Sequence, residues 1–335
     1  MFEQKRLIAE FEEQSFTQII FPHAKTDWAP YLREAQDSFC NIINAIIPFQ
    51  KCLVICSDKE SVQKEFTAHP NLFFVEYETD DTWARDCSAL CVSEANTTHL
   101  LDFQFNAWGG KFEAKRDNTL SHAIQHCYKA PMKTIDFVLE GGAVESNAKD
   151  TILTTAACVL NPNRNPQYNN IQITQKLKEC FGAKHILYLN HGYLAGDDTD
   201  SHIDTLARFI DEKTIMYVQC KDKEDEHYHQ LLLMEEELHM IAKEQNLNLI
   251  ALPMPDAVFY EDERLPATYA NFLFINNAVL VPTYNVAQDT IALDIFRQTF
   301  PKKEILAIDA SILIRQHGSL HCVTMNFPAA VSLAC

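Results

Sequence analysis

The sequence predicts an α/β fold in which short strands alternate with amphipathic helices. Short apolar runs rich in β-branched and aromatic residues recur along the 335-residue chain, as strands require. Longer segments instead carry apolar residues at the spacing of one helix face. No Gly/Ser linker or low-complexity stretch separates these segments. About five strand–helix units fit this rhythm, although they resemble one another too weakly to establish a repeat.

The predicted strands are Ile19–Phe21, Cys52–Cys56, Leu72–Tyr77, His99–Phe105, Ile135–Leu139, Ile152–Thr155, Ile186–Leu189, Thr214–Gln219, Phe272–Ile275, Ala278–Val281, Glu304–Ile308 and His321–Met325. The predicted helices are Tyr31–Ile47, Ile171–Phe181, Glu226–Gln245 and Thr290–Thr299. Pro48 is expected to end the first helix. The acidic start of the third helix suits a helix N-terminus, because the helix dipole favours negative charge there.

A doubly wound nucleotide-binding fold is not favoured. The chain has only eight glycines, and neither a G-x-G-x-x-G pattern nor a Walker A sequence occurs in it. Acidic residues outnumber basic ones by 46 to 28, which gives a formal net charge of −18. Such a surface repels phosphate backbones, so nucleic acid is not an expected partner. It favours the approach of a small cation as a salt-screened rate effect, or it serves solubility alone.

The chain contains eleven cysteines, and its first residues show no signal-peptide pattern. We therefore expect a cytoplasmic location and free thiols, most of them buried as small apolar side chains. No cysteine pair is followed by a second pair at zinc-like spacing. The apolar runs fall short of the ~20 residues that span a bilayer, so no membrane association is expected. The oligomeric state stays open, a homo-oligomer included.

The segment Asp81-Thr-Trp-Ala-Arg-Asp86 follows a predicted strand and is expected in a loop at the strand's end. Carboxylates in such a loop can accept paired hydrogen bonds from a planar guanidinium. Trp83 can cover the face of that cation. The simpler interpretation is an Asp–Arg turn beside a tryptophan of the core.

Two glycines follow Glu140 in Phe137-Val-Leu-Glu-Gly-Gly142. They permit a tight turn, and Glu140 can orient an imidazole as the third group of a triad does. Taken alone, the segment is better explained as a glycine turn that ends a strand.

A cluster of acidic and polar residues occupies Gly196-Asp-Asp-Thr-Asp-Ser-His-Ile-Asp-Thr205. If this segment is extended, His202 and Asp204 point to the same side, so that one can handle protons while the other holds a substrate. A solvated acidic turn is the simpler interpretation. A divalent metal site is a third, although the ordered spacing and glycine of a calcium loop are missing.

Cys322 lies in His317-Gly-Ser-Leu-His-Cys-Val-Thr324, where a glycine and a serine give the backbone freedom before the thiol. A thiol becomes a nucleophile only where a nearby base or cation favours the thiolate. Adjacent residues of a strand face opposite ways, so His202 rather than His321 is expected to serve Cys322. The simpler interpretation is one more buried cysteine among eleven.

Taken together, these segments resemble the agmatine deiminases, in the family that includes bacterial peptidylarginine deiminases. The resemblance spans nearly the whole chain and rests on motifs that follow one another in the family's order. They are Asp81-Thr-Trp-Ala-Arg-Asp86, Phe105-Asn-Ala-Trp-Gly-Gly110, Leu139-Glu-Gly-Gly142, His202-Ile-Asp204, Ala270-Asn-Phe272 and Gly318-Ser-Leu-His-Cys322. Cys87–Ala89 and His317–Leu320 depart from the family's small-residue and glycine-rich runs, which leaves the shape of the pocket and the choice of substrate open.

The resemblance implies a pentein α/β propeller, with five ββαβ-type units around a pseudo-fivefold axis and the site in the central channel. It implies a single agmatine deiminase-like catalytic domain over residues 1–335. The implied catalytic residues are Cys322 as nucleophile, His202 as general acid/base, Asp86 and Asp204 as a guanidinium clamp, and Glu140 as support. The implied substrate-binding residues are Trp83, Asp198, Trp108 and Gly318.

The implied reaction is the hydrolysis of agmatine to N-carbamoylputrescine and ammonia through a covalent Cys322 amidino-thioether, a step in putrescine and polyamine biosynthesis. No metal or organic cofactor is expected. Free arginine and peptidyl-arginine are alternative substrates, and transfer of the amidino group to an amine is an alternative reaction. A catalytically silent guanidinium- or polyamine-binding protein is an alternative class.

Overall fold

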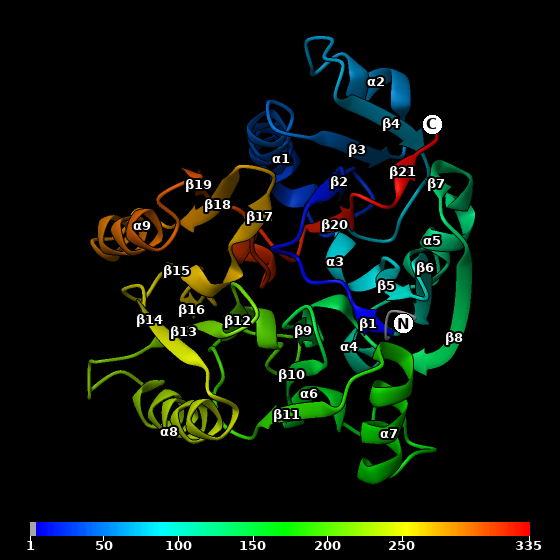
Figure 1. The fold of residues 1–335 in the computed structure, drawn as a ribbon. Helices are drawn as coiled ribbons and strands as arrows, with labels where there is room; N and C mark the ends of the chain where they lie inside the picture. The colour runs from blue at the N-terminus through cyan, green and yellow to red at the C-terminus, as the bar shows by residue number, and fades with distance from the viewer. Residues whose placement is uncertain (1–4) are drawn as a thin grey trace.

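The computed structural model describes residues 5–335 (Figure 1). The first four residues, which belong to the segment expected to show no signal-peptide pattern, lie outside the described part. Five sheets of three or four strands form among the described residues. In sheet order they are β1 (Arg6–Leu7), β5 (Leu90–Glu94), β6 (Thr97–Gln104) and β8 (Met132–Val138); β11 (His185–Leu189), β10 (Thr151–Thr155) and β9 (Glu145–Ser146); β12 (Ala207–Phe209), β13 (Thr214–Gln219) and β14 (Asn248–Pro253); β17 (Leu273–Ile275), β18 (Ala278–Thr283) and β19 (Glu304–Asp309); and β20 (Thr324–Pro328), β2 (Gln14–Ile20), β3 (Lys51–Cys56) and β4 (Leu72–Glu76).

Each of these sheets combines an antiparallel pair with a parallel pair. For example, β12 pairs antiparallel with β13, and β13 pairs parallel with β14. A parallel pair needs a crossover connection. A long helix lies in this connection in four of the sheets: α1 (Leu32–Ile46), α7 (Asn170–Phe181), α8 (Tyr228–Gln245) and α9 (Gln288–Thr299). The connection between β6 and β8 contains only short helices and turns. Figure 1 shows the sheets arranged around the middle of the molecule, with α7, α8 and α9 at its periphery.

Short elements complete the fold. They are the two-stranded pairs β7 (Tyr128–Lys129) with β21 (Ser332–Leu333) and β15 (Phe259–Tyr260) with β16 (Glu263–Arg264); the helices α2 (Lys59–Gln63), α3 (Ala84–Cys87), α4 (Ala107–Gly110), α5 (Leu120–Ala123) and α6 (Ala156–Val159); and the 3₁₀ turns η1 (Ala29–Tyr31), η2 (Asp117–Thr119), η3 (Gln125–Cys127), η4 (Gly141–Ala143), η5 (Ile203–Thr205), η6 (Tyr269–Asn271) and η7 (Leu313–Gln316). Several of these short helices and turns carry the candidate site.

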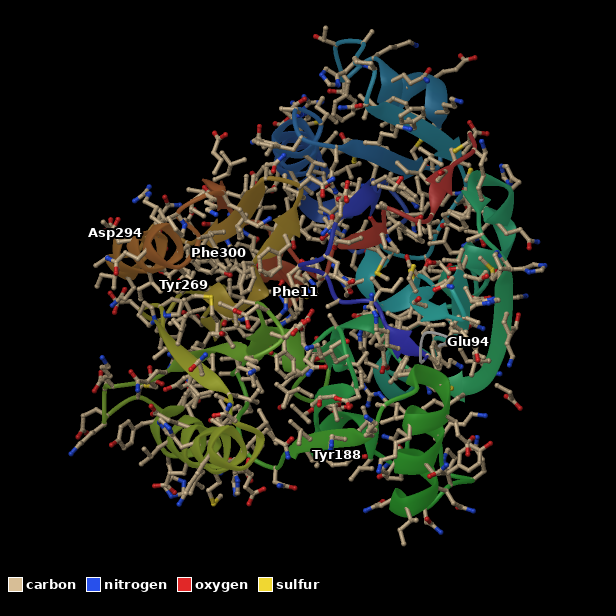
Figure 2. The ribbon with its side chains drawn as sticks, in the orientation of Figure 1. Phe11, Glu94, Tyr188, Tyr269, Asp294 and Phe300 are labelled. Carbon is tan, nitrogen blue, oxygen red and sulfur yellow. The ribbon has the colours of Figure 1, made fainter. Side chains whose placement is uncertain are left out.

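The long helices form where the sequence predicts them, and α7 has the clearest end signals. Helix α8 begins at Tyr228, so the acidic residues expected at its start precede it. In α7, Asn169 and Gln172 form a reciprocal capping box at the start, and Gly182 adopts the left-handed conformation that ends the helix. The apolar face of a helix packs inward, while side chains such as Asp294 of α9 lie on the outer surface (Figure 2). Tyr269 is fully buried and donates its hydroxyl to Asp289 at 2.6 Å.

Several strand predictions were incomplete or wrong. Strand β2 begins at Gln14 and ends at Ile20, earlier than the predicted Ile19–Phe21. Of the strands in the five sheets, β1, β5, β9, β12 and β14 were not predicted. The predicted strand His321–Met325 starts only at Thr324, so His321 and Cys322 lie in a turn before it.

The buried cysteines behave as predicted for small apolar side chains: Cys52, Cys56 and Cys220 are almost inaccessible to solvent. All eleven thiols are free of disulfides. Within residues 5–335, none of the helices combines the length and the apolar character that crossing a bilayer requires.

Candidate active site

A cavity of about 260 Å³ brings together six residues predicted for the site, which come from four separate stretches of the chain. They are Trp83, Asp86, Trp108, Asp198, Gly318 and Cys322. The remaining predicted residues, His202, Asp204 and Glu140, lie behind this lining and are buried almost completely.

Gly142 marks the point where three of these side chains converge. A Cβ atom at Gly142 would lie 2.6 Å from His202 Nδ1, 2.9 Å from Asp204 Oδ2 and 3.0 Å from Asp86 Oδ1. Real side chains do not tolerate such distances, so only glycine fits at this position. The second glycine after Glu140 is therefore required by the site, and not only by the turn η4 that contains it.

Asp86 lies in the short helix α3 and is held by two hydrogen bonds. The backbone N–H of Gly142 donates to its Oδ1 at 3.0 Å, and the indole N–H of Trp108 donates to its Oδ2 at 3.0 Å. Burial raises the pKa of Asp86, although the neighbouring His202 opposes this shift. The carboxylate is thus fixed in position, and a positively charged partner would stabilise its ionised form.

His202 is fully buried, and neither of its ring nitrogens has a hydrogen-bond partner among the described residues. Its Nδ1 lies 3.7 Å from Asp86 Oδ1. Burial disfavours the charged ring, but the carboxylate of Asp86 and the thiol of Cys158 outweigh burial and raise the pKa of His202 to about 10. A protonated imidazole is a proton donor for a leaving group.

Asp204 does not lie in an extended segment, as the alternation argument assumed, because residues Ile203–Thr205 form the 3₁₀ turn η5. Its Oδ2 lies 2.6 Å from His321 Nδ1, while its buried Oδ1 has no partner among the described residues. Burial raises the pKa of Asp204, but His321 more than offsets that effect and lowers it overall. Its free oxygen is a candidate acceptor for a substrate N–H.

Cys322 is buried beside Asn271, whose Oδ1 lies 3.4 Å from the sulfur. Burial raises the thiol's pKa well above its usual range, and the charges of Asp204 and Asp86 raise it further. The thiol is therefore neutral in the free protein. A cation bound between the two aspartates would cancel their charges and favour the thiolate.

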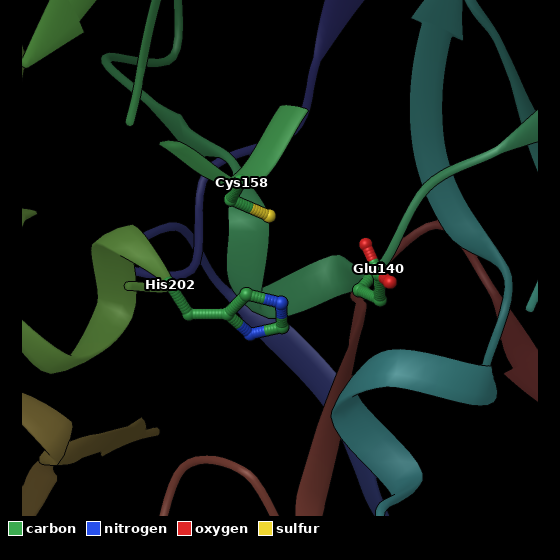
Figure 3. Close-up of side chains that lie close together, drawn as sticks. All are labelled: Glu140, Cys158 and His202. Carbon is green, nitrogen blue, oxygen red and sulfur yellow. The ribbon is translucent and has the colours of Figure 1, made fainter. Parts of the chain in front are cut away.

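Glu140 contacts Arg164 instead of His202. Both carboxylate oxygens of Glu140 lie 2.9 Å from Arg164 Nε, and both side chains are completely buried. Figure 3 shows Glu140, Cys158 and His202 close together, with one possible ligand atom of each within 4.8 Å of the others. We assign no metal to this cluster, because the guanidinium of Arg164 already supplies the positive charge at Glu140.

Trp83 and Trp108 form one wall of the cavity, with ring centroids 6.2 Å apart and ring planes at 77° to each other. A Cβ atom at Gly318 would lie 2.1 Å from the Trp83 ring, so this glycine lets the ring lie flat against the backbone. The Trp83 indole N–H donates to Asp81 Oδ2 at 2.8 Å. Trp83, named from the sequence as a substrate-binding residue, lines the cavity, and its binding role stays a prediction; Asp81 also lines it but was not named.

Asp27 and Asp81 also line the cavity, together with Asp198. The Oδ1 of Asp81 is buried without a partner among the described residues. Burial raises the pKa of Asp81 to about 8, and the charges of Asp27 and Asp117 add to this effect. The lining contains no lysine or arginine within the described chain. Asp81 belongs to the motif Asp81–Asp86, whereas Asp27 lies in a loop outside any recognised motif, so no sequence pattern pointed to it.

The fold itself resembles that of a cysteine-to-serine variant of DDAH from Pseudomonas aeruginosa, crystallised with citrulline. The TM-score is 0.53 at 13% identity, and the match covers 94% of this chain and all (100%) of that one. The chain therefore has a mixed α/β fold similar to that of this structure. Within that class, it belongs to the Porphyromonas-type peptidyl-arginine deiminase family, whose profile matches residues 6–328.

Solved agmatine deiminases are similar over nearly the full chain. A cysteine-to-serine variant of the C. jejuni agmatine deiminase with substrate bound is 42% identical, with a TM-score of 0.92, and the match covers 96% of each chain. The agmatine deiminase of Enterococcus faecalis is 27% identical, with a TM-score of 0.88, and the match covers 97% of this chain and 96% of that one.

Proposed function

We propose that this protein is an agmatine deiminase, which hydrolyses agmatine to N-carbamoylputrescine and ammonia in polyamine biosynthesis. One observation carries the choice of substrate. The cavity joins Cys322 and Asp86 to a set of further carboxylates, Asp27, Asp81 and Asp198, with no described lysine or arginine in its lining. Agmatine has a guanidinium at one end and an ammonium at the other, so each end can pair with carboxylates of the lining.

Free arginine fits this cavity less well. Its α-carboxylate would face the acidic lining and would need a cationic partner, and burial of an unpaired charge is costly. An ammonium beside Asp81 has the opposite effect, because it stabilises the ionised form of a carboxyl group whose pKa burial has raised to about 8. The same acids therefore favour agmatine and disfavour amino-acid substrates.

In the proposed reaction, the carboxylates of Asp86 and Asp204 hold the guanidinium flat by paired hydrogen bonds. The bound cation lowers the pKa of Cys322, the thiol proton passes to solvent, and the thiolate attacks the central carbon of the guanidinium. The imidazolium of His202 protonates an amino group of the adduct, which leaves as ammonia. Neutral His202 then takes a proton from a water molecule, the resulting hydroxide attacks the amidino-thioether, and the thiolate leaves as the product forms.

The remaining predicted residues have supporting roles in this proposal. Trp83 and Trp108 enclose the aliphatic chain and the guanidinium face, Asp198 contributes to the acidic end, and Gly318 leaves room for the Trp83 ring. Glu140 acts indirectly, through His202, because its negative charge helps to keep His202 protonated. Positioning of this kind supplies up to ~7–11 kcal/mol in favourable cases.

The direct test is to assay agmatine, arginine and an arginine-containing peptide side by side, with ammonia release and product mass as readouts. Agmatine is expected to be hydrolysed with the highest kcat/KM. The Cys322→Ser variant is expected to bind agmatine but to release almost no ammonia, whereas Cys335→Ser, at an exposed thiol, keeps full activity.

Other outcomes would replace the proposal. Preference for arginine or the peptide would assign a different substrate, and transfer to an added amine would assign an amidinotransferase. Ammonia release by Cys322→Ser at the normal rate would remove the covalent step. Binding of agmatine by the wild type without turnover would assign a binding protein.

We also propose the finer architecture that the resemblance implies: five ββαβ-type units about a pseudo-fivefold axis, in one catalytic domain over residues 1–335. The alternating antiparallel and parallel pairs in the five sheets support it, and so does the length of the family match. The cytoplasmic location, the oligomeric state and the lack of a cofactor stay predictions.

A further inference from the structure

The N-terminal segment reaches His321 beside a second cavity, whose lining shares no residue with that of the substrate cavity. After strand β1, the chain places Glu10 against this second, much smaller cavity of about 60 Å³, whose lining includes Arg85, Glu145 and His321. The Glu10 side chain is only 9% exposed. No motif in the sequence singled out Glu10, and the proposed reaction does not use it.

Glu10 is held by contacts from four other parts of the chain. Its Oε1 accepts the backbone N–H of Phe274 at 2.7 Å, and its Oε2 lies 3.1 Å from Arg85 Nη2 and 3.1 Å from Arg208 Nη2. The same Oε2 contacts His321 Nε2. Burial opposes ionisation of Glu10, but the charges of His321, Arg208 and Arg85 outweigh burial and hold its pKa well below the usual range.

His321 stands between two carboxylates. Its Nε2 faces Glu10, and its Nδ1 faces Asp204 Oδ2 at 2.6 Å. A neutral imidazole can donate only one hydrogen bond, whereas an imidazolium donates two. Two ionised acceptors, one at each nitrogen, therefore favour the charged ring. Asn271 fixes the backbone of the same residue, because its Oδ1 accepts the His321 N–H at 2.9 Å.

We propose that Glu10 and His321 are positioning residues for the guanidinium clamp. Glu10 keeps His321 doubly protonated, and His321 in turn keeps Asp204 ionised, with its free Oδ1 available to the substrate. The proposal rests on the proposed function only for its catalytic readout, because the charge state of His321 can be measured without any substrate.

A comparison of the two clamp residues supports this chain of contacts. Asp86 and Asp204 are both buried beside Gly142 and His202, yet burial raises the pKa of Asp86, whereas the pKa of Asp204 is lowered. The difference lies in their partners: Asp86 accepts neutral N–H groups from Gly142 and Trp108, while Asp204 has the ring of His321.

The charged groups around the chain of contacts come from several elements. Arg85 of α3 and Arg208 of β12 face Glu10, and Glu145 of β9 contacts Arg208 Nε. Glu145 is buried and paired with arginine like Glu10. Its charge acts on His321 only at longer range, since no hydrogen bond or ion pair joins the two among the described contacts. It therefore provides a matched control for the loss of a buried, arginine-paired acid.

The kinetic test compares Glu10→Gln with Glu145→Gln. A glutamine at position 10 can still accept from Phe274 and contact His321, but it no longer favours the imidazolium, so the pKa of Asp204 rises. The acid limb of kcat/KM for agmatine is expected to move up by about one pH unit in Glu10→Gln, mainly through KM. Glu145→Gln is expected to lower thermal stability without moving that limb. An unchanged limb in a folded Glu10→Gln variant would overturn the proposal.

The second test measures the charge state in the wild-type protein, and a variant is used only to assign the His321 signal. Nitrogen-15 NMR of labelled histidines, with His321 assigned from a His321→Gln spectrum, is expected to show both ring nitrogens protonated at about pH 7. A neutral His321 ring would disprove the proposed charge state. This measurement would still decide the charge state of His321 if agmatine turned out not to be the substrate.

Discussion

Trp108 donates its indole N–H to the Asp86 carboxylate at 3.0 Å, from a stretch of backbone in an uncommon conformation. Ala107, Trp108, Gly109 and Gly110 all have positive φ values, of 51°, 54°, 93° and 82°. Residues other than glycine adopt such values at a cost of about 1–3 kcal/mol each, and they tend to do so at functional sites. The conformation of this turn costs local stability, but it places the indole of Trp108 against the carboxylate of Asp86.

Trp108→Phe is expected to lower kcat/KM for agmatine by about tenfold or more, because it removes a hydrogen bond to a buried carboxylate but keeps the ring. Steady-state assays measure this effect. Trp28→Phe is the matched control, since Trp28 makes a similar indole hydrogen bond, to Thr82 at 2.8 Å, outside the cavity lining. Equal losses in both variants would point to a general packing effect.

Asp27→Asn tests the acidic end of the cavity. It is expected to lower kcat/KM for agmatine by about tenfold, equivalent to ~1.4 kcal/mol, and to leave the hydrolysis of butylguanidine, which lacks the amine, unchanged. Asp37→Asn, at a surface acid paired with Arg33, controls for the general effect of lost charge. A parallel loss on both substrates would show that Asp27 does not recognise the amine.

Asp81→Asn is expected to stabilise the substrate-free protein at alkaline pH. The pKa of Asp81 is raised from 3.8 to about 8 in the folded chain. Between those values the folded protein holds a proton that the unfolded chain has lost, so the Asp81 contribution to stability falls as pH rises through that window. Thermal melts at about pH 9 should favour the variant by at least ~1 kcal/mol, whereas melts below about pH 4 should coincide. A destabilised variant at alkaline pH would contradict the raised pKa.

Gly142→Ala is expected to abolish turnover while the protein stays folded. The added methyl would lie within 2.6–3.0 Å of His202, Asp204 and Asp86, so it must displace the groups that hold the guanidinium. Agmatine binding, measured by calorimetry, is expected to weaken together with kcat. Normal kinetics would show that these three side chains do not need to meet at this point.

Much of the fold could be predicted because strong periodicity reports local structure. Helices α1, α7, α8 and α9 and strand β13 were found nearly to the residue. Strand β12 has only three residues, and β14 ends at a proline, Pro253, a residue type that is uncommon within strands. Short strands such as these depend on their partners, which local sequence does not reveal.

The site was predictable as a set of residue types but not as a set of contacts. Both arguments from strand alternation failed, since His202–Asp204 and His321–Cys322 lie in turns, where side-chain directions do not alternate. Asp27 and Glu10 carry no local signal. They reach the cavity and His321 through packing between segments hundreds of residues apart in sequence, as in the Glu10–His321 pair separated by 311 positions.

Strand β20 pairs with β2, so the last part of the chain completes the sheet in which one of the first strands lies. A growing polypeptide on the ribosome therefore exposes β2 as a bare edge until synthesis is almost finished, and such edges invite aggregation. Because Cys322 lies two residues before β20, the same late event that covers this edge also delivers the sulfur. On the proposed role of Cys322, prematurely terminated chains are then both inactive and poorly protected, which makes them natural targets for quality control.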